Sequence, residues 1–181
     1  MKRNGNKLIR LCGIVICLSL LFPFGGCGGD KYNAVLYDNV NEWMNKEFLK
    51  ENKTYGACYL NENYNENEDD WNEQILIDKT SPQSRAFVTK EKEEFDKIFS
   101  SFPIEVNFEK EIILIYIFTT VYLSRPYKLN SINVQNQVVI IEYEMEKANG
   151  TTDTSMPGQR CFAVKMNKLE ITAAEFTVKG T

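Results

Sequence analysis

Three tyrosines stand close together in the middle of the chain. Tyr116, Tyr122 and Tyr127 lie within or shortly after the apolar segment 112–118. A tyrosine offers an apolar ring and a hydroxyl group that both donates and accepts hydrogen bonds, so such a group suits recognition of a partner. The same residues would also suit a packed core with hydroxyls at a sheet edge. Both interpretations remain open, and the three tyrosines are the candidate binding surface.

The segment 61–73 is the candidate cation site, because it contains six carboxylates and five asparagines. The oxygen-bearing residues Asn61, Asn63, Asn65 and Asp69 fall at positions 1, 3, 5 and 9 of a frame like the EF-hand calcium loop. Position 6 is Glu66 where that loop needs glycine, and position 12 is Asn72 where it needs a bidentate acid. We therefore expect a solvated acidic loop, with no metal and no cofactor.

The chain contains no histidine, which excludes Ser-His-Asp and Cys-His catalysis and every zinc site that uses histidine. No S-x-x-K, G-x-S-x-G, P-loop or dinucleotide-binding pattern occurs either. Glycoside hydrolysis needs only two carboxylates at a suitable separation, and 25 acids are present. The sequence thus leaves a small carboxylate-dependent hydrolase of envelope or extracellular substrates as the alternative function, with no catalytic residue to name.

The first 26 residues have the pattern of a secretory signal. Four basic residues and no acid precede an apolar run from Leu11 to Phe24, which is too short to span a membrane as a helix. The following Gly25-Gly26-Cys27 resembles the lipobox of bacterial lipoproteins, although Phe24 stands where that family usually has leucine. The resemblance implies lipidation of Cys27 by diacylglyceryl and further acyl chains such as palmitate, and anchoring on the outer face of the cytoplasmic membrane. The alternatives are an ordinary cleaved signal with an incidental thiol, or an uncleaved anchor.

Removal of residues 1–26 leaves 17 basic against 25 acidic residues, a net charge of −8. An acidic surface argues against nucleic acid as a partner, because phosphate binding depends on clustered lysine and arginine. The remaining 155 residues suffice for a single domain. We expect a lipidated N-terminus and linker at 27–38 and one domain at 39–181, with a protein or cell-envelope partner and an undetermined oligomeric state.

Two further cysteines, Cys58 and Cys161, lie in strand-like surroundings outside the signal. Outside the cytoplasm an even pair suggests a disulfide. Two separate thiols behaving as small apolar side chains are the other interpretation, and the sequence does not decide between them.

The periodicity of apolar residues predicts an α+β fold. Amphipathic helices are expected over 39–51 and 90–102, the second with Thr89 as its cap. Strands are expected at the following segments: 55–60, 74–78, 85–89, 112–118, 127–134, 138–143, and two around a turn near residues 167–168. We therefore expect an antiparallel meander with two amphipathic helices covering one face.

Residues 85–178, from the segment RAFVT to CFAVKMNK, weakly resemble the C-terminal domain of the protease-complex regulatory subunit family of bacteria. That domain is a small non-catalytic module, and of its usual Gly-Gly-Tyr turn only Tyr127 is present here. The whole chain also resembles clostridial lipoproteins of unknown function. Together the sequence favours a membrane-anchored, extracytoplasmic lipoprotein that acts as a non-enzymatic binding module.

Overall fold

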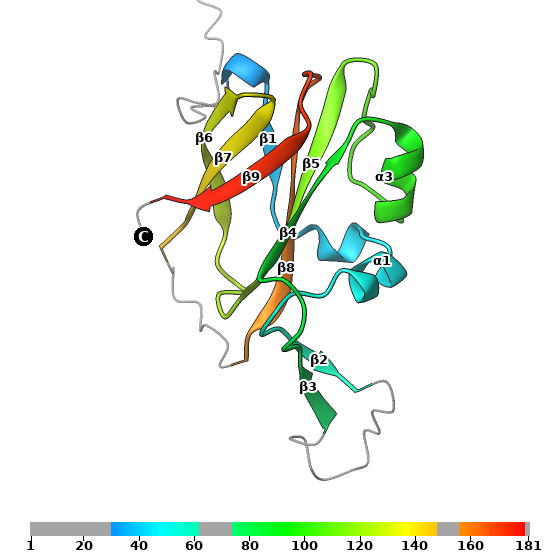
Figure 1. Ribbon diagram of the computed structural model, residues 1–181, viewed down its shortest axis with the longest axis vertical. Coiled ribbons are helices and arrows are strands. Elements are labelled where there is room, and N and C mark those ends of the chain that lie inside the picture. The colour runs from blue at the N-terminus through cyan, green and yellow to red at the C-terminus, as the bar shows by residue number, and fades with distance from the viewer. Residues whose placement is uncertain (1–29, 62–73, 148–155, 180–181) are drawn as a thin grey trace, which may run out of the picture.

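The computed structural model describes residues 30–61, 74–147 and 156–179. Strands arranged in two packed sheets dominate the fold, with a small hairpin at one end (Figure 1). A sheet-dominated, mostly antiparallel fold is confirmed. The strands are β1 (Val35–Tyr37), β2 (Cys58–Leu60), β3 (Ile75–Ile77), β4 (Ser84–Thr89), β5 (Glu111–Thr120), β6 (Tyr127–Gln135), β7 (Val138–Met145), β8 (Gly158–Asn167) and β9 (Ala173–Val178).

The larger sheet has the order β1-β8-β5-β4, and all its neighbours are antiparallel. Its central strand β5 carries the apolar run that the sequence marks, and successive side chains point to opposite faces. Ile113, Ile115 and Ile117 face one side, where they form a buried cluster with residues of the helical segments. Ile112 and Leu114 face the smaller sheet and form a second buried cluster with its residues. The strand is thus covered on both sides, as its composition predicts.

The smaller sheet has the order β6-β7-β9. The predicted β6–β7 hairpin is confirmed, with Gln135 opposite Val138 and with Asn136 and Gln137 at positive φ in the turn. The predicted meander is wrong, because β9 pairs with β7 in parallel while β8 lies between β1 and β5 in the other sheet. The two last strands therefore belong to different sheets.

The helical segments are shorter than the sequence pattern predicts. The expected helix 39–51 is divided into the 3-10 turn η2 (Val40–Trp43) and the helix α1 (Lys46–Glu51), separated by extended Met44. The helix α3 spans Lys92–Ile98, and Thr89 belongs to β4, where its hydroxyl donates to the carbonyl of Ile113. The expectation that two amphipathic helices cover one face is not confirmed, since α1 contains no fully buried residue.

The linker expected at 27–38 is partly folded. A 3-10 turn η1 (Asp30–Tyr32) precedes β1, which pairs with β8 at the edge of the larger sheet. Three residues are too few to show strand periodicity, so the sequence pattern does not reveal β1. In Figure 1, η1 lies at one end of the long axis and the β2–β3 hairpin at the other.

Glu111, at the start of β5, supplies a pH-dependent contact between strands. Its Oε1 atom lies 2.6 Å from the Nζ atom of Lys165 on β8, and its Oε2 atom accepts from the backbone N–H of Asn107. Hydrogen bonding to Lys165, followed by that to Asn107, lowers the pKa of Glu111 in the folded protein. A lowered folded-state pKa stabilises the protein above the unfolded-state pKa, and this stabilisation is lost as the pH falls through the folded-state pKa.

We therefore expect Glu111→Gln to weaken the dependence of the unfolding free energy on pH below about pH 5, since an unfolded glutamate titrates near 4.3. Urea unfolding between neutral and acid pH measures this directly. Glu170→Gln, at an exposed position, is the matched control and should follow the wild-type curve. If the unfolding free energy of Glu111→Gln falls in acid as much as that of the wild type, the pair of Glu111 and Lys165 does not contribute to the pH dependence.

Candidate functional site

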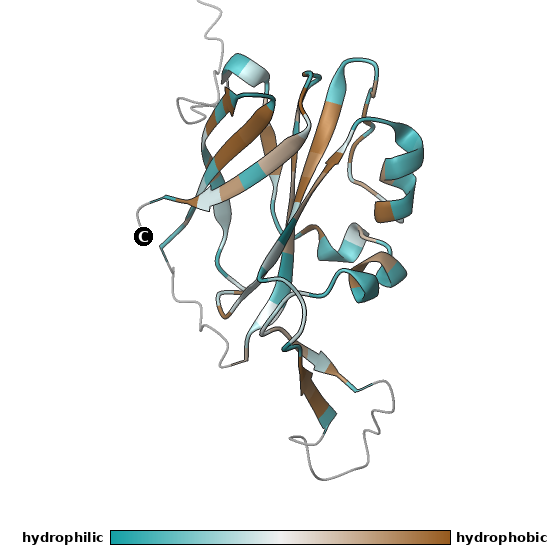
Figure 2. Cartoon of the chain, viewed as in Figure 1, coloured by the Kyte–Doolittle hydropathy of each residue, from teal (hydrophilic) through white to brown (hydrophobic). Residues whose placement is uncertain are grey.

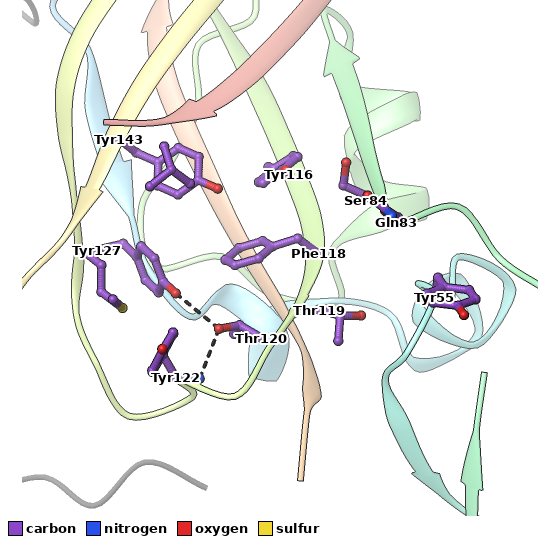
Figure 3. Close-up of a pocket in the computed structure, with 12 residues that line it drawn as sticks. Tyr55, Gln83, Ser84, Tyr116, Phe118, Thr119, Thr120, Tyr122, Tyr127 and Tyr143 are labelled. Carbon is purple, nitrogen blue, oxygen red and sulfur yellow. Dashed lines mark hydrogen bonds between the residues drawn. The ribbon is translucent and has the colours of Figure 1, made fainter. Parts of the chain in front are cut away.

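The two sheets pack together at one end, and at the other end a cavity opens between them. At the closed end, Val88 of β4 and Ala174 of β9 pack into one buried cluster, and the Nζ atom of Lys90 donates to the carbonyl of Ile171. At the open end lies a cavity of about 530 Å³, a volume typical of ligand sites. Figure 3 shows the residues that line it: Tyr55, Gln83, Ser84, Tyr116, Phe118, Thr119, Thr120, Tyr122, Tyr127, Tyr143, Met145 and Val178. We call this cavity the tyrosine pocket.

An aromatic cluster forms the floor of the tyrosine pocket. The alternation along β5 places Tyr116 and Phe118 on the same face, and their rings are stacked with centroids 5.0 Å apart. The fully buried Phe162 of β8 lies opposite Tyr116 in the strand register and contacts both rings. Because every ring packs against neighbours, the floor is preorganised.

Neutral hydroxyl groups complete the inner wall. Tyr143 of β7 is 3% exposed, and burial, with a smaller contribution from the nearby Tyr116, raises the pKa of its hydroxyl. Burial also raises the pKa of Tyr127, whose hydroxyl lies 3.4 Å from the Oγ1 atom of Thr120 (Figure 3). Both phenols therefore remain protonated at neutral pH and can donate as well as accept hydrogen bonds.

The lining of the tyrosine pocket contains no lysine, arginine, aspartate or glutamate among the described residues. Two guanidinium groups lie against lining rings from outside the lining: that of Arg125 is 4.5 Å from the ring centroid of Tyr122. That of Arg160 is 4.9 Å from the ring centroid of Tyr127. The NH2 atom of Arg160 lies 2.7 Å from Oδ2 of Asp38 and its Nε atom 3.2 Å from Oδ1. The NH1 atom donates to the carbonyls of Tyr122 and Leu123. Arg160 therefore fixes the turn at the mouth of the pocket through four hydrogen bonds to Asp38, Tyr122 and Leu123.

Tyr116, Tyr122 and Tyr127, the predicted binding surface, all line this one pocket. Of the two interpretations made from the sequence, the binding surface fits Tyr122 and core packing fits Tyr127. Tyr122 is 37% exposed at the rim, whereas the ring of Tyr127 is only 7% exposed and belongs to the core. Sequence reasoning missed Tyr143, although the alternation of VVIIEYEM along β7 places it on the same face as the buried Val139 and Ile141.

The two predicted partner cysteines are unbridged in the structure. Cys161 is fully buried in the cluster that Ile113, Ile115 and Ile117 form with the helical segments, and burial raises the pKa of its thiol. Cys58 of β2 is half-buried and lines a second cavity with Tyr59 and Gln159. The hydroxyl of Tyr59 donates to the side chain of Gln159 over 2.8 Å. The structure therefore agrees with the interpretation that the two residues are separate thiols.

We expect iodoacetamide to label Cys58 in the native protein while Cys161 reacts only after unfolding, because a buried thiol with a raised pKa is inert. Peptide mapping by mass spectrometry, with and without denaturant, measures both rates. Recovery of a Cys58–Cys161 linked peptide from the non-reduced protein would contradict this expectation.

Other predicted positions lie partly or wholly outside the described residues. Cys27 lies outside the described residues. So does the candidate cation loop 61–73 apart from its first residue, Asn61, and the predicted ligands Asn63, Asn65 and Asp69 are therefore not described. Within the described ranges, no group of three or more histidine, cysteine, aspartate or glutamate residues is arranged to hold a metal ion.

None of the helices in the described part of the chain is sufficiently long and apolar to cross a membrane. Comparisons of the chain with protein-family models, curated proteins and solved structures give no match.

Proposed function

We propose that this protein is a non-enzymatic binding module that holds an uncharged ligand group in the tyrosine pocket. The observation that carries this proposal is the composition of the pocket, in which a preorganised aromatic floor meets neutral hydroxyl groups. Pockets that bind small molecules are typically apolar and aromatic with a few well-placed polar groups.

The chemistry near the pocket supports binding over catalysis. A carboxyl group that acts as a general acid needs a raised pKa. Three described carboxyl groups, those of Asp78, Glu111 and Glu144, have clearly shifted pKa values, and hydrogen bonding lowers all three. None of the three lines the tyrosine pocket.

The proposal includes a lipid anchor at Cys27 on the outer face of the cytoplasmic membrane, as the lipobox-like sequence suggests. The first described residue, Asp30, lies three positions after Cys27, at the end of the molecule opposite the β2–β3 hairpin (Figure 1). The tyrosine pocket lies where β5 ends and β6 begins, toward the hairpin end. A tether at Cys27 would therefore leave the pocket open to ligands on the side away from the membrane.

The proposal also includes the expectation that helices cover one face of the sheet. We propose that α3 and the segment 40–51 shield one face of the larger sheet. Phe95 and Ile98 of α3, with Val40 and Met44, join the cluster on that face, which supports this role. The tyrosine pocket, between the two sheets, lies on the other side of the larger sheet from these helical segments.

A fragment-binding experiment tests the proposed function. The full chain, in a detergent without a sugar head group, is screened by saturation-transfer NMR against neutral and charged fragments. We expect neutral amphipathic fragments to bind in competition with one another. Ser84→Trp places an indole in the pocket and should remove this binding, whereas Ser101→Trp, at an exposed position outside the pocket, should not.

The same preparations are assayed with chromogenic glycosides and esters, and we expect no turnover. Turnover that disappears when a single aspartate or glutamate is replaced would move the protein into the hydrolase class. Fragment binding that survives Ser84→Trp would place the site elsewhere. Thermal melts of both tryptophan variants establish that each is folded.

A further inference from the structure

We propose that the ligand of the tyrosine pocket is an uncharged glycan, bound with one sugar ring at the mouth and its hydroxyls directed inward. This inference rests on the proposed function and names the class of ligand. It follows from three properties of the pocket: exposed rings at the rim, neutral hydroxyls within and the lack of charge in the lining.

Two tyrosine rings flank the mouth. Tyr55 is 49% exposed and Tyr122 is 37% exposed, although both are large side chains with substantial apolar area. Figure 3 shows them on opposite sides of the pocket, with the ring of Phe118 between them and Tyr143 on the side of Tyr122. The C–H face of a sugar ring is flat and apolar, so it can pack on an exposed tyrosine ring while its hydroxyls remain free to form hydrogen bonds.

The inner groups match a polyhydroxylated ligand. Hydroxyls of Ser84, Thr120 and Tyr143 line the wall, and each hydroxyl offers one donor and two acceptor positions. The Oγ1 atom of Thr120 accepts from the backbone N–H of Tyr122 over 3.0 Å, and its contact with the Tyr127 hydroxyl is long at 3.4 Å. These hydroxyls therefore have positions left for further hydrogen bonds. Sugar hydroxyls can donate to them and accept from them.

Other classes of ligand fit less well. A charged group inside the pocket would lose its hydration without meeting an opposite charge in the lining, which has none. Of the two cations next to lining rings, Arg160 is bonded to Asp38, and Arg125 lies over the ring of Tyr122 at the rim. A pure hydrocarbon group would cover the hydroxyls and leave their remaining donor and acceptor positions unfilled, which costs free energy for each buried group. A neutral ligand with an apolar face and many hydroxyls avoids both costs.

Isothermal titration of the full chain with cellohexaose, maltohexaose and chitohexaose tests the inference, again in a detergent without a sugar head group. We expect saturable binding of at least one of them. Tyr122→Ala should weaken it about tenfold by removing a stacking surface, and Tyr143→Phe about fivefold by removing one hydroxyl. Tyr37→Phe, which alters a tyrosine packed against Phe102 away from the pocket, is the matched control and should bind as wild type.

Failure of all three glycans to bind, or binding that is unaffected in both Tyr122→Ala and Tyr143→Phe, would overturn the glycan assignment. Preferential binding of an uncharged apolar peptide such as acetyl-Leu-Phe-Val-amide in the pocket would also overturn it. In these cases the fragment screen still reports on the proposed function: pocket-dependent fragment binding without glycan binding would leave the binding module intact and refute only the ligand class.

Discussion

Replacement of Asp38 by alanine is expected to lower the free energy of unfolding by about 3 kcal/mol. Asp38 accepts two hydrogen bonds from the guanidinium of Arg160, whose side chain is 4% exposed, and a third from the backbone N–H of Tyr127. Removal of the carboxylate leaves a buried cation without a counterion and a buried N–H without an acceptor. Denaturant unfolding of the full chain measures the loss.

The matched control is Asp96→Ala, which breaks the pair of Lys92 and Asp96 on α3. Those side chains are 69% and 53% exposed, so the expected cost is at most about 1 kcal/mol. The double variant Asp38→Ala/Arg160→Met, which removes both charges, should be more stable than Asp38→Ala alone. Equal losses in Asp38→Ala and Asp96→Ala would show that the Arg160 contact does not hold the pocket mouth.

Phe162→Ala should have the largest effect, lowering the free energy of unfolding by about 3 to 5 kcal/mol. Phe162 is fully buried and its ring contacts those of Tyr116, Phe118, Tyr127, Tyr143 and Phe176. Its removal leaves a cavity beneath the floor of the tyrosine pocket, so the surrounding rings lose contacts as well as buried area. Chemical unfolding monitored by circular dichroism gives the magnitude.

Phe162→Leu keeps part of the volume and should cost less, while Leu76→Ala, at a side chain that is 50% exposed, should change stability by no more than about 0.5 kcal/mol. Figure 2 shows that β3, which carries Leu76, is hydrophobic although it lies at the edge of the molecule. A loss in Phe162→Ala no larger than that in Leu76→Ala would contradict the packing described here.

The fold could be predicted from sequence wherever local pattern decides the structure. The apolar run 112–118 predicts a strand covered on both faces, and alternation around residues 135–138 predicts the β6–β7 hairpin. The helix expected at 39–51 is interrupted because Met44 is extended and forms a bridge with Phe99, while Asn45 caps α1 by accepting from the N–H of Glu47. That bridge depends on a residue far along the chain, which periodicity does not reveal.

Strand pairing was harder to predict from the sequence than the strands themselves. The pattern of β9 fits pairing with β8 or with β7 equally well, and only the assembled molecule selects the parallel partner β7. The same holds for the site. Tyr116, Tyr122 and Tyr127 are near one another in sequence, but Tyr55 and Tyr143 reach the pocket only through the folding of distant segments.

The central claim, that ligands bind in the tyrosine pocket, is tested most directly by NMR of the full chain with isotopically labelled tyrosine rings. The strongest neutral fragment from the screen is titrated into the sample. We predict that the ring signals of Tyr116, Tyr122 and Tyr143 shift in a saturable manner while those of Tyr32 and Tyr37, which do not line the pocket, remain in place. Shifts confined to Tyr32 or Tyr37, or no saturable shift in the three pocket tyrosines, would contradict the claim.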